Sequence, residues 1–318
     1  MKSASRECDV ICLGLVGADH VCEPIPQFPA PGTLVSTPGL TLAVGGSAAN
    51  VSVDLARLEV RVRLFGRVGD DWLGDFLRRE LETANVDCSG LAQSSTAQTA
   101  TTLAINVGSE DRRFIHAHGA NAELTGTEVT PEDLERCRVL CVGGLGLNPK
   151  LSGENVSRLF QTARDLDVTT VLDVVLGDPQ RTREMLEHIL PWTDVFVPNE
   201  DEARAITGIS DARQQAKQFI GMGARTAVIT RAAWGAVMWD ANSTEFEVAA
   251  FPVNQVDSTG GGDAFLAGFV FGLLRGKPAS DCLTWGAAMG ASCVRANGAT
   301  AGVFTADELM QFVAEQAK

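Results

Sequence analysis

The sequence predicts an α/β fold, a three-layer sandwich with a mostly parallel central sheet and a small β-sheet lid. Two observations predict it. Short β-rich apolar runs alternate with longer stretches of helical periodicity, which is typical of a parallel sheet with helices on both faces. Two other regions break this alternation and have the composition of a separate small sheet.

Six apolar runs predict the buried strands of the central sheet. They are residues 10–16, 62–65, 139–142, 170–175, 195–197 and 227–230. Helical patterns occupy residues 48–58, 72–84, 152–166, 182–190, 199–207 and 211–222. Two more helix starts have capping signals, Thr130 before Pro131 and Thr305 three residues before Glu308. Ligands of such sheets bind beyond the carboxyl ends of the strands.

The lid is expected from insertions at about residues 18–44 and 97–120. The first is rich in proline. The second alternates polar and apolar residues, which predicts a half-exposed antiparallel sheet. We expect the two regions to pair over the active edge of the main sheet. No composition shift marks a second unit, so residues 1–318 are predicted to form a single domain.

Composition argues against several classes of function. The 318-residue chain has a formal net charge of −14, which disfavours nucleic-acid and anionic-membrane partners. Its eight cysteines form no CxxC pair and no zinc motif, which is typical of reduced thiols. The N-terminus lacks a leader pattern, and no apolar run reaches the ~18 residues that span a bilayer. We therefore expect a cytoplasmic protein.

The junction at residues 257–263 carries the strongest chemical signal. It has the sequence Asp-Ser-Thr-Gly-Gly-Gly-Asp, and an almost wholly apolar run, residues 264–274, follows. Three glycines leave backbone N–H groups uncovered, and a helix starting there adds unpaired N–H groups and the positive end of its dipole. This arrangement suits a phosphate, with Asp263 inside the site. The alternative is a Gly-rich turn with an ordinary helix-start Asp.

Two motifs near the N-terminus suggest contacts with a ligand. Gly45 and Gly46 precede a helix, where glycine lets a ligand approach the backbone, and Asn50 can bond hydroxyls with both groups of its amide. A tight turn into a helix is the alternative. Asp19 follows the first strand, where α/β sheets carry ligands, although it also suits a turn.

Asn199 and Glu202 lie three residues apart and therefore share one helix face. Their oxygen atoms suit a magnesium ion, held directly or through water. Acids in the first turn of a helix are also routine, so a purely structural role stays open. No GxxxxGK[ST] motif occurs, and no GxGxxG stands at a βαβ start, which disfavours P-loop kinases and dinucleotide-dependent oxidoreductases.

The order of these motifs resembles that of the ribokinase-like (PfkB-type) carbohydrate kinases. Residues 45–58 followed by 65–74 are similar to the N-terminal motif of that family, and residues 257–263 to its C-terminal motif. Asn199 and Glu202 match its NxxE element. The resemblance covers essentially the whole chain. It departs at Ala232, where many members have the first glycine of the nucleotide loop, and at Ser47, where ribokinase-type proteins often have lysine.

The resemblance implies ATP-dependent phosphorylation of a hydroxymethyl group on a small sugar or sugar acid. Asp263 would be the catalytic base, and three glycines would form the anion hole, namely Gly260, Gly261 and Gly262. The sugar would be held by Asp19, Gly45, Gly46 and Asn50. ATP would be bound by Asn199, Thr230, Gly235, Gly260, Gly262 and Gly298.

The resemblance also implies cofactors and partners. Asn199 and Glu202 would organise Mg²⁺, and Asp257 and Thr259 match positions where several members bind a monovalent cation, usually K⁺. The lid would permit a homodimer, as in several relatives. Few basic residues lie near the motifs, which disfavours a phosphorylated sugar, although Arg112 or Arg113 can reach in from the lid.

Two other functions stay open. A nucleoside kinase of the same family would need aromatic stacking in the lid, and the chain has no Tyr, so Phe28 and Phe114 are the candidates. The second open function is that of a catalytically silent, sugar-binding regulator on this fold. The intact Asp263 and the run of three glycines argue against it.

Overall fold

Nine strands form the central sheet of the computed structural model, which describes residues 7–108 and 113–316. They are β1 (Val10–Gly14), β4 (Val62–Gly69), β5 (Asp87–Ser94), β8 (Val139–Leu145), β9 (Thr169–Val174), β10 (Val195–Phe196), β11 (Thr226–Thr230), β12 (Ala236–Asp240) and β13 (Glu245–Val248). Their order is β13-β12-β11-β10-β9-β8-β1-β4-β5. From β11 to β5 all pairs are parallel, whereas β12 and β13 join antiparallel. The predicted α/β sheet is confirmed.

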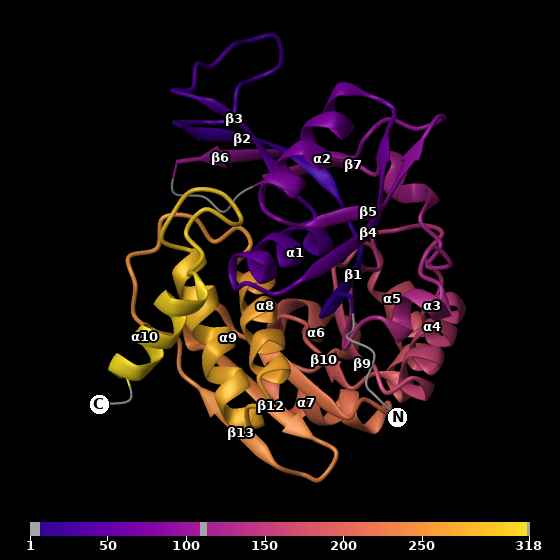
Figure 1. Ribbon diagram of the computed structural model, residues 1–318. Coiled ribbons are helices and arrows are strands. Elements are labelled where there is room, and N and C mark those ends of the chain that lie inside the picture. The colour runs from indigo at the N-terminus through magenta and orange to yellow at the C-terminus, as the bar shows by residue number, and fades with distance from the viewer. Residues whose placement is uncertain (1–6, 109–112, 317–318) are drawn as a thin grey trace.

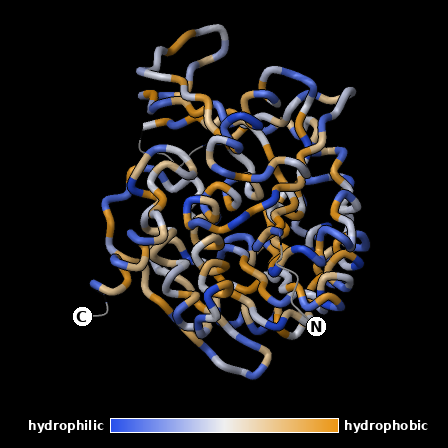
Figure 2. Tube along the Cα trace, viewed as in Figure 1, coloured by the Kyte–Doolittle hydropathy of each residue, from blue (hydrophilic) through white to orange (hydrophobic). Residues whose placement is uncertain are grey.

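Helices cover both faces of this sheet (Figure 1). They are α1 (Ser47–Arg57), α2 (Trp72–Thr83), α3 (Pro131–Glu135), α4 (Gly153–Asp165), α5 (Pro179–Ile189), α6 (Glu200–Thr207), α7 (Ala212–Gly221), α8 (Gly261–Leu274), α9 (Ala279–Cys293) and α10 (Ala306–Gln316), with 3₁₀ turns η1 (Gly119–Glu123), η2 (Leu190–Trp192) and η3 (Ala232–Trp234). One core lies between the sheet and α1, α2, α8, α9 and α10, and the other between the sheet and α3 to α7. In Figure 2, hydrophobic positions run through the middle of the molecule and hydrophilic ones are frequent around its outline.

The predicted strands and helices are all present, within a few residues of the expected ends. Three strands were not predicted, β5, β12 and β13, which lie at or next to the two edges of the sheet. Because one side of an edge strand faces solvent, β5 and β13 lack the continuous apolar runs of the central strands. β12 lies one strand in from the edge and has an apolar run at residues 236–239 that the sequence analysis missed. The two capping signals are confirmed, since Thr130 and Thr305 each exchange hydrogen bonds with the acid three residues later.

A second sheet of four strands lies at the edge of the main sheet and is called the lid sheet here (Figure 1). Its strands are β2 (Gly17–Ile25), β3 (Leu40–Gly45), β6 (Thr101–Val107) and β7 (Arg113–Ala117), in the order β3-β2-β6-β7. The antiparallel pairing expected of the second insertion is confirmed, since β6 and β7 run antiparallel, and the two insertions pair with each other through β2 and β6, which run parallel. Both strands continue from parallel strands of the main sheet, β1 and β5, and so enter the lid in the same direction.

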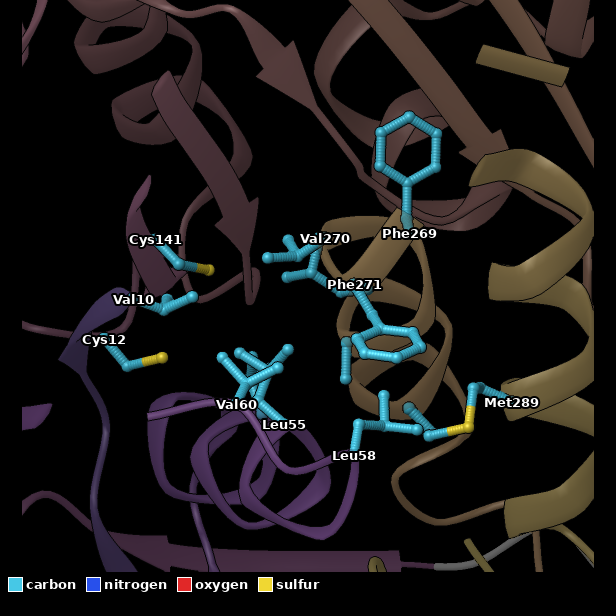
Figure 3. Close-up of a cluster of buried hydrophobic side chains, with 14 of the residues drawn as sticks. Val10, Cys12, Leu55, Leu58, Val60, Cys141, Phe269, Val270, Phe271 and Met289 are labelled. Atoms are coloured by element: carbon cyan, nitrogen blue, oxygen red, sulfur yellow. The ribbon is translucent and has the colours of Figure 1, made fainter. Parts of the chain in front are cut away.

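The buried helix α8 is held between α1 and α9. Figure 3 shows its residues Val270 and Phe271 beside Leu55 and Leu58 at the α1 side of one core. On the α9 side, a Cβ at Gly268 would lie 2.5 Å from the carbonyl oxygen of Trp285. Because Gly268 has no side chain, α9 packs directly against the backbone of α8, and this packing fixes where the N-terminus of α8 lies.

Two further observations concern membrane-spanning helices and the cysteines. Within the described ranges no helix combines the length and the apolar character needed to cross a bilayer. All eight cysteines fall in those ranges, and each is buried and unbridged, as expected of structural thiols.

Candidate functional site

The N-terminus of α8 is the centre of the site. Gly260 caps the helix with a left-handed backbone, φ 76°, and a Cβ there would lie 2.3 Å from the carbonyl oxygen of Ala299. The N–H of Gly261 donates to the carbonyl of Ser258 at 3.3 Å. Gly262 is exposed, and a Cβ there would meet no atom within 4 Å. The first turn of the helix is therefore open to an anionic ligand at Gly262.

Asp263 follows these glycines and is bound by a residue far away in the sequence. Asn50 of α1 donates from Nδ2 to Oδ2 of Asp263 at 2.8 Å. Burial raises the pKa of Asp263 to about 7, the Asn50 hydrogen bond opposes this shift, and the negative charge of Asp19 adds to it. A carboxylate whose pKa lies near neutral pH suits a general base.

Asp19, on the lid strand β2, completes this centre. Burial raises its pKa to about 6, although a hydrogen bond from Thr102 opposes the shift. A Cβ at Gly45 would lie 2.2 Å from the carboxyl carbon of Asp19, so only glycine leaves room for this carboxylate. Gly46 caps α1 with φ 92° and lies against the carbonyl of Leu15. The two glycines therefore bring the start of α1 directly beside Asp19.

Two further polar residues of the lid sheet lie beside Asp19, and the sequence analysis did not indicate either of them. Thr102 of β6 pairs with Asp19 in register, and His116 of β7 pairs with Thr102. The hydroxyl of Thr102 is 3.1 Å from Nδ1 of His116. Among the described side chains, Nε2 of His116 is buried and has no hydrogen-bond partner. Isolated polar residues in an alternating strand carry no signal of this role. Arg112 lies outside the described residues.

Asn199 and Glu202 form a capping box at the start of α6. The side chain of Asn199 accepts from the N–H of Glu202, and that of Glu202 accepts from the N–H of Asn199, each at 2.9 Å. The structural role left open by the sequence is thus present. Burial raises the pKa of Glu202 to about 7, and the charge of Asp263 contributes to the rise. The pair therefore faces the central site as well as capping the helix.

Asp173 is an acidic site residue that the sequence reasoning missed. It lies near the end of β9, where its Oδ2 accepts from the N–H of Gly144 at 3.2 Å. Burial, then the charges of Glu202 and Asp263, hold its pKa well above the usual range. An acid near the carboxyl end of an otherwise apolar strand is the signal that would have found it.

These carboxyl groups favour a cation beside them, because a positive charge offsets repulsion among Asp173, Glu202 and Asp263. Within the part of the chain that the structure describes, no three His, Cys, Asp or Glu side chains are grouped to enclose a metal. A magnesium ion would therefore need oxygen ligands from a bound phosphate and from water as well.

The remaining predicted positions form two loops. Asp257 accepts from the N–H and the hydroxyl of Thr259 at 2.8 and 2.7 Å, and from the N–H of Gly298 at 2.9 Å. The proposed cation residues and Gly298 therefore lie together. Thr230 forms an isolated parallel β-bridge with Asn199. Gly235 closes the other loop with φ 83°, where a Cβ would lie 2.0 Å from the carbonyl of Val248.

Ala232, the departure from the resembled family, has a left-handed backbone with φ 46°. A Cβ in this region costs about 1–2 kcal/mol relative to glycine. The neighbouring Trp234 is 77% exposed. The backbone at position 232 therefore has the conformation that glycine favours, and the alanine there is strained.

We predict that Ala232→Gly raises the midpoint of thermal unfolding, because relief of about 1–2 kcal/mol of strain exceeds the added entropy of the unfolded chain, about 0.4–1 kcal/mol. Ala233→Gly is the matched control. Its backbone is not left-handed, so glycine there should lower the midpoint. Calorimetry measures the unfolding midpoint of both variants. An equal lowering of the two midpoints would contradict backbone strain at Ala232.

Known proteins resemble this chain over most of its length. The model of the pfkB family carbohydrate kinases matches residues 9–306. Ribokinase of Haemophilus influenzae is 28% identical over 306 residues, 95% of this chain and 97% of that protein. The 5-dehydro-2-deoxygluconokinase of Clostridium tetani is 25% identical over 291 residues, 87% of this chain and 85% of that protein.

Solved structures show the same fold. The structure of Arabidopsis thaliana ribokinase complexed with ribose and ATP matches 96% of this chain and 98% of its own, with a TM-score of 0.84 at 20% identity. The family match spans the lid sheet, the central sheet and the glycine-rich start of α8. The chain belongs to the pfkB family of carbohydrate kinases.

Proposed function

We propose that this chain transfers the terminal phosphoryl group of ATP to a hydroxymethyl group of a small, unphosphorylated sugar or sugar acid. The observation that carries the proposal is the Asn50–Asp263 hydrogen bond beside the open first turn of α8. This bond holds the carboxyl of Asp263, whose pKa is about 7, in the first turn of a helix whose N-terminus suits a phosphate. The names of the relatives, a ribokinase and a 5-dehydro-2-deoxygluconokinase, support a sugar or sugar-acid acceptor.

The reaction follows from these positions. The acceptor oxygen forms a bond to the γ-phosphorus while its proton passes to Asp263, and the bond from that phosphorus to the bridging oxygen of ADP breaks. Backbone N–H groups at Gly260, Gly261 and Gly262 stabilise the transferring phosphoryl, an effect worth about 2.7–4 kcal/mol per donor in comparable anion holes. The N–H of Gly261 shares its proton with the carbonyl of Ser258, at 3.3 Å, or leaves that bond when the phosphoryl is present. Positioning and electrostatics supply most of the catalysis in such transfers.

The other residues bind and orient. Asp19, Gly45, Gly46 and Asn50 hold the sugar under the lid, and Thr230, Gly235 and Gly298 line the ATP site. Magnesium, held near Asn199 and Glu202 with Asp173 beside them, would neutralise charge on the phosphates. A monovalent cation such as K⁺ is proposed at Asp257 and Thr259. Because both oxygens of Asp257 already accept hydrogen bonds, this ion would add to an ordered loop.

A nucleoside acceptor is the second candidate, and one observation favours it. Register places Phe114 on the same face of the lid sheet as Thr102 and His116. Phe114 is 58% exposed, so an aromatic surface lies on the same face of the lid sheet as Asp19. Phe28 is the other candidate ring, and the guanidinium of Arg113 lies 5.4 Å from its centroid.

Asp263→Asn should lower kcat by about 10²–10⁴-fold, because the general base is lost, while ATP binding stays near the wild-type value. A coupled ADP-release assay over sugars, sugar acids and nucleosides, with calorimetry for ATP, measures both. Asp307→Asn is the control, since Asp307 is an exposed acid in the first turn of α10. Near-normal turnover by Asp263→Asn would contradict the mechanism. Thermal stabilisation by a sugar without turnover in the wild type would favour the silent regulator.

We also propose that two copies pair through the outer face of the lid sheet. Leu40, Leu103 and Ile115 are 70%, 37% and 61% exposed, and register places all three on the face opposite Asp19. A cavity of about 380 Å³ lies among them. Light scattering should give twice the 33.7 kDa chain mass, and Leu103→Lys should give a monomer. A monomeric wild type at micromolar concentration would contradict the pairing.

A further inference from the structure

One buried acid has no part in the proposed mechanism. Asp54, on the inner side of α1, is 0% exposed, and among the described residues neither of its carboxyl oxygens has a hydrogen-bond partner. Burying an unpaired carboxylate costs so much free energy that such a group normally takes up a proton. A protonated carboxyl is a hydrogen-bond donor, and a buried donor needs an acceptor.

A candidate acceptor on the same helix is Asn50. The two residues are four apart, which places them on one face of α1, one turn from each other. That face packs against α8, where Nδ2 of Asn50 donates to Asp263. Oδ1 of Asn50 is buried and, in the described part of the chain, has no donor. One unpaired acceptor and one carboxyl that must carry a proton therefore lie on the same buried face.

We infer that Asp54 is a positioning residue, which in its protonated form donates its O–H to Oδ1 of Asn50 and so holds Nδ2 toward Asp263. The inference rests on the proposed role of Asp263 as the base. Which way a side-chain amide points is set by its hydrogen bonds. Without a donor at Oδ1, the amide of Asn50 can turn and place that oxygen against the carboxylate of Asp263.

The charges around Asp54 agree with a neutral group. Burial raises the pKa of Asp54 well above the usual range, the charge of Asp263 on α8 adds to the rise, and Arg57, one turn further along α1, opposes it. The thiol of Cys293 on α9 also interacts with Asp54, and burial holds the pKa of that thiol above its usual range. The strands beneath α1 contribute two more buried thiols, Cys12 and Cys141.

Two variants of similar size test the inference. Asp54→Asn keeps a neutral donor and should leave kcat within about 3-fold of the wild type. Asp54→Leu removes the donor and should lower kcat by about 10–100-fold, the equivalent of about 1.4–2.7 kcal/mol in the activation free energy, with a much smaller change in KM for the sugar.

The pH dependence of kcat separates positioning from a merely structural role. Because the Asn50 bond lowers the pKa of Asp263, its loss in Asp54→Leu should move the acid limb of the profile to higher pH. The limb should not move in Asp54→Asn. If Asp54 were ionised, both variants would remove a negative charge near Asp263 and move the limb to lower pH. That result, or an unmoved limb in Asp54→Leu, overturns the inference.

A second measurement does not need turnover, so it distinguishes failure of this inference from failure of the proposed function. A carboxyl with a raised folded-state pKa stabilises the fold at low pH and loses that contribution as pH rises through this pKa. The Tm of Asp54→Asn relative to the wild type should therefore increase from pH 5 to pH 9. A difference in Tm that does not change with pH overturns the inference, even where Asp54→Leu fails to fold.

Discussion

The site depends on holding a partly buried carboxyl group beside the open N-terminus of a helix. Burial alone would hold Asp263 protonated, because removing a carboxylate from water is costly. The Asn50 hydrogen bond opposes this, and the dipole of α8 favours the ionised form by about 0.3–1 kcal/mol. The balance places the pKa of Asp263 at about 7, where the group can accept a proton and later release it.

The rest of the fold maintains this balance by fixing α8. Glycines on α8 let α9 approach within contact of its backbone, and apolar residues of α1 pack on the other side. Gly260 lies so close to Ala299 that the loop after α9 also sets where the helix begins. Since the interior is closely packed, a side chain added at these contacts would shift the helix and with it the base.

The local motifs of the site could be predicted from the sequence because glycine and a helix start leave a continuous pattern. Residues 257–263 and 45–50 are of this kind, and both lie where such patterns place them. Asn199 and Glu202 could be found but not assigned to one role, since a capping box and a cation site need the same residues. Asp173 was missed although its place near the carboxyl end of an apolar strand marks it. Asp54 could not be found, because a single acid within a helix has no spacing to mark it. The parallel direction of the β2–β6 pair was not predicted, because strand direction depends on distant connections.

The central claim is that Asp263 acts as a base whose pKa has been raised to about 7. The most direct measurement is kcat/KM of the wild type for the sugar from pH 5 to 9 with ATP saturating, because this ratio reports the pKa of the enzyme before the sugar binds. The base must be ionised to work, so kcat/KM should rise with pH, reach half its maximum near pH 7 and then stay constant. A kcat/KM that does not change between pH 5 and 8, or that falls as pH rises through 7, would contradict the account.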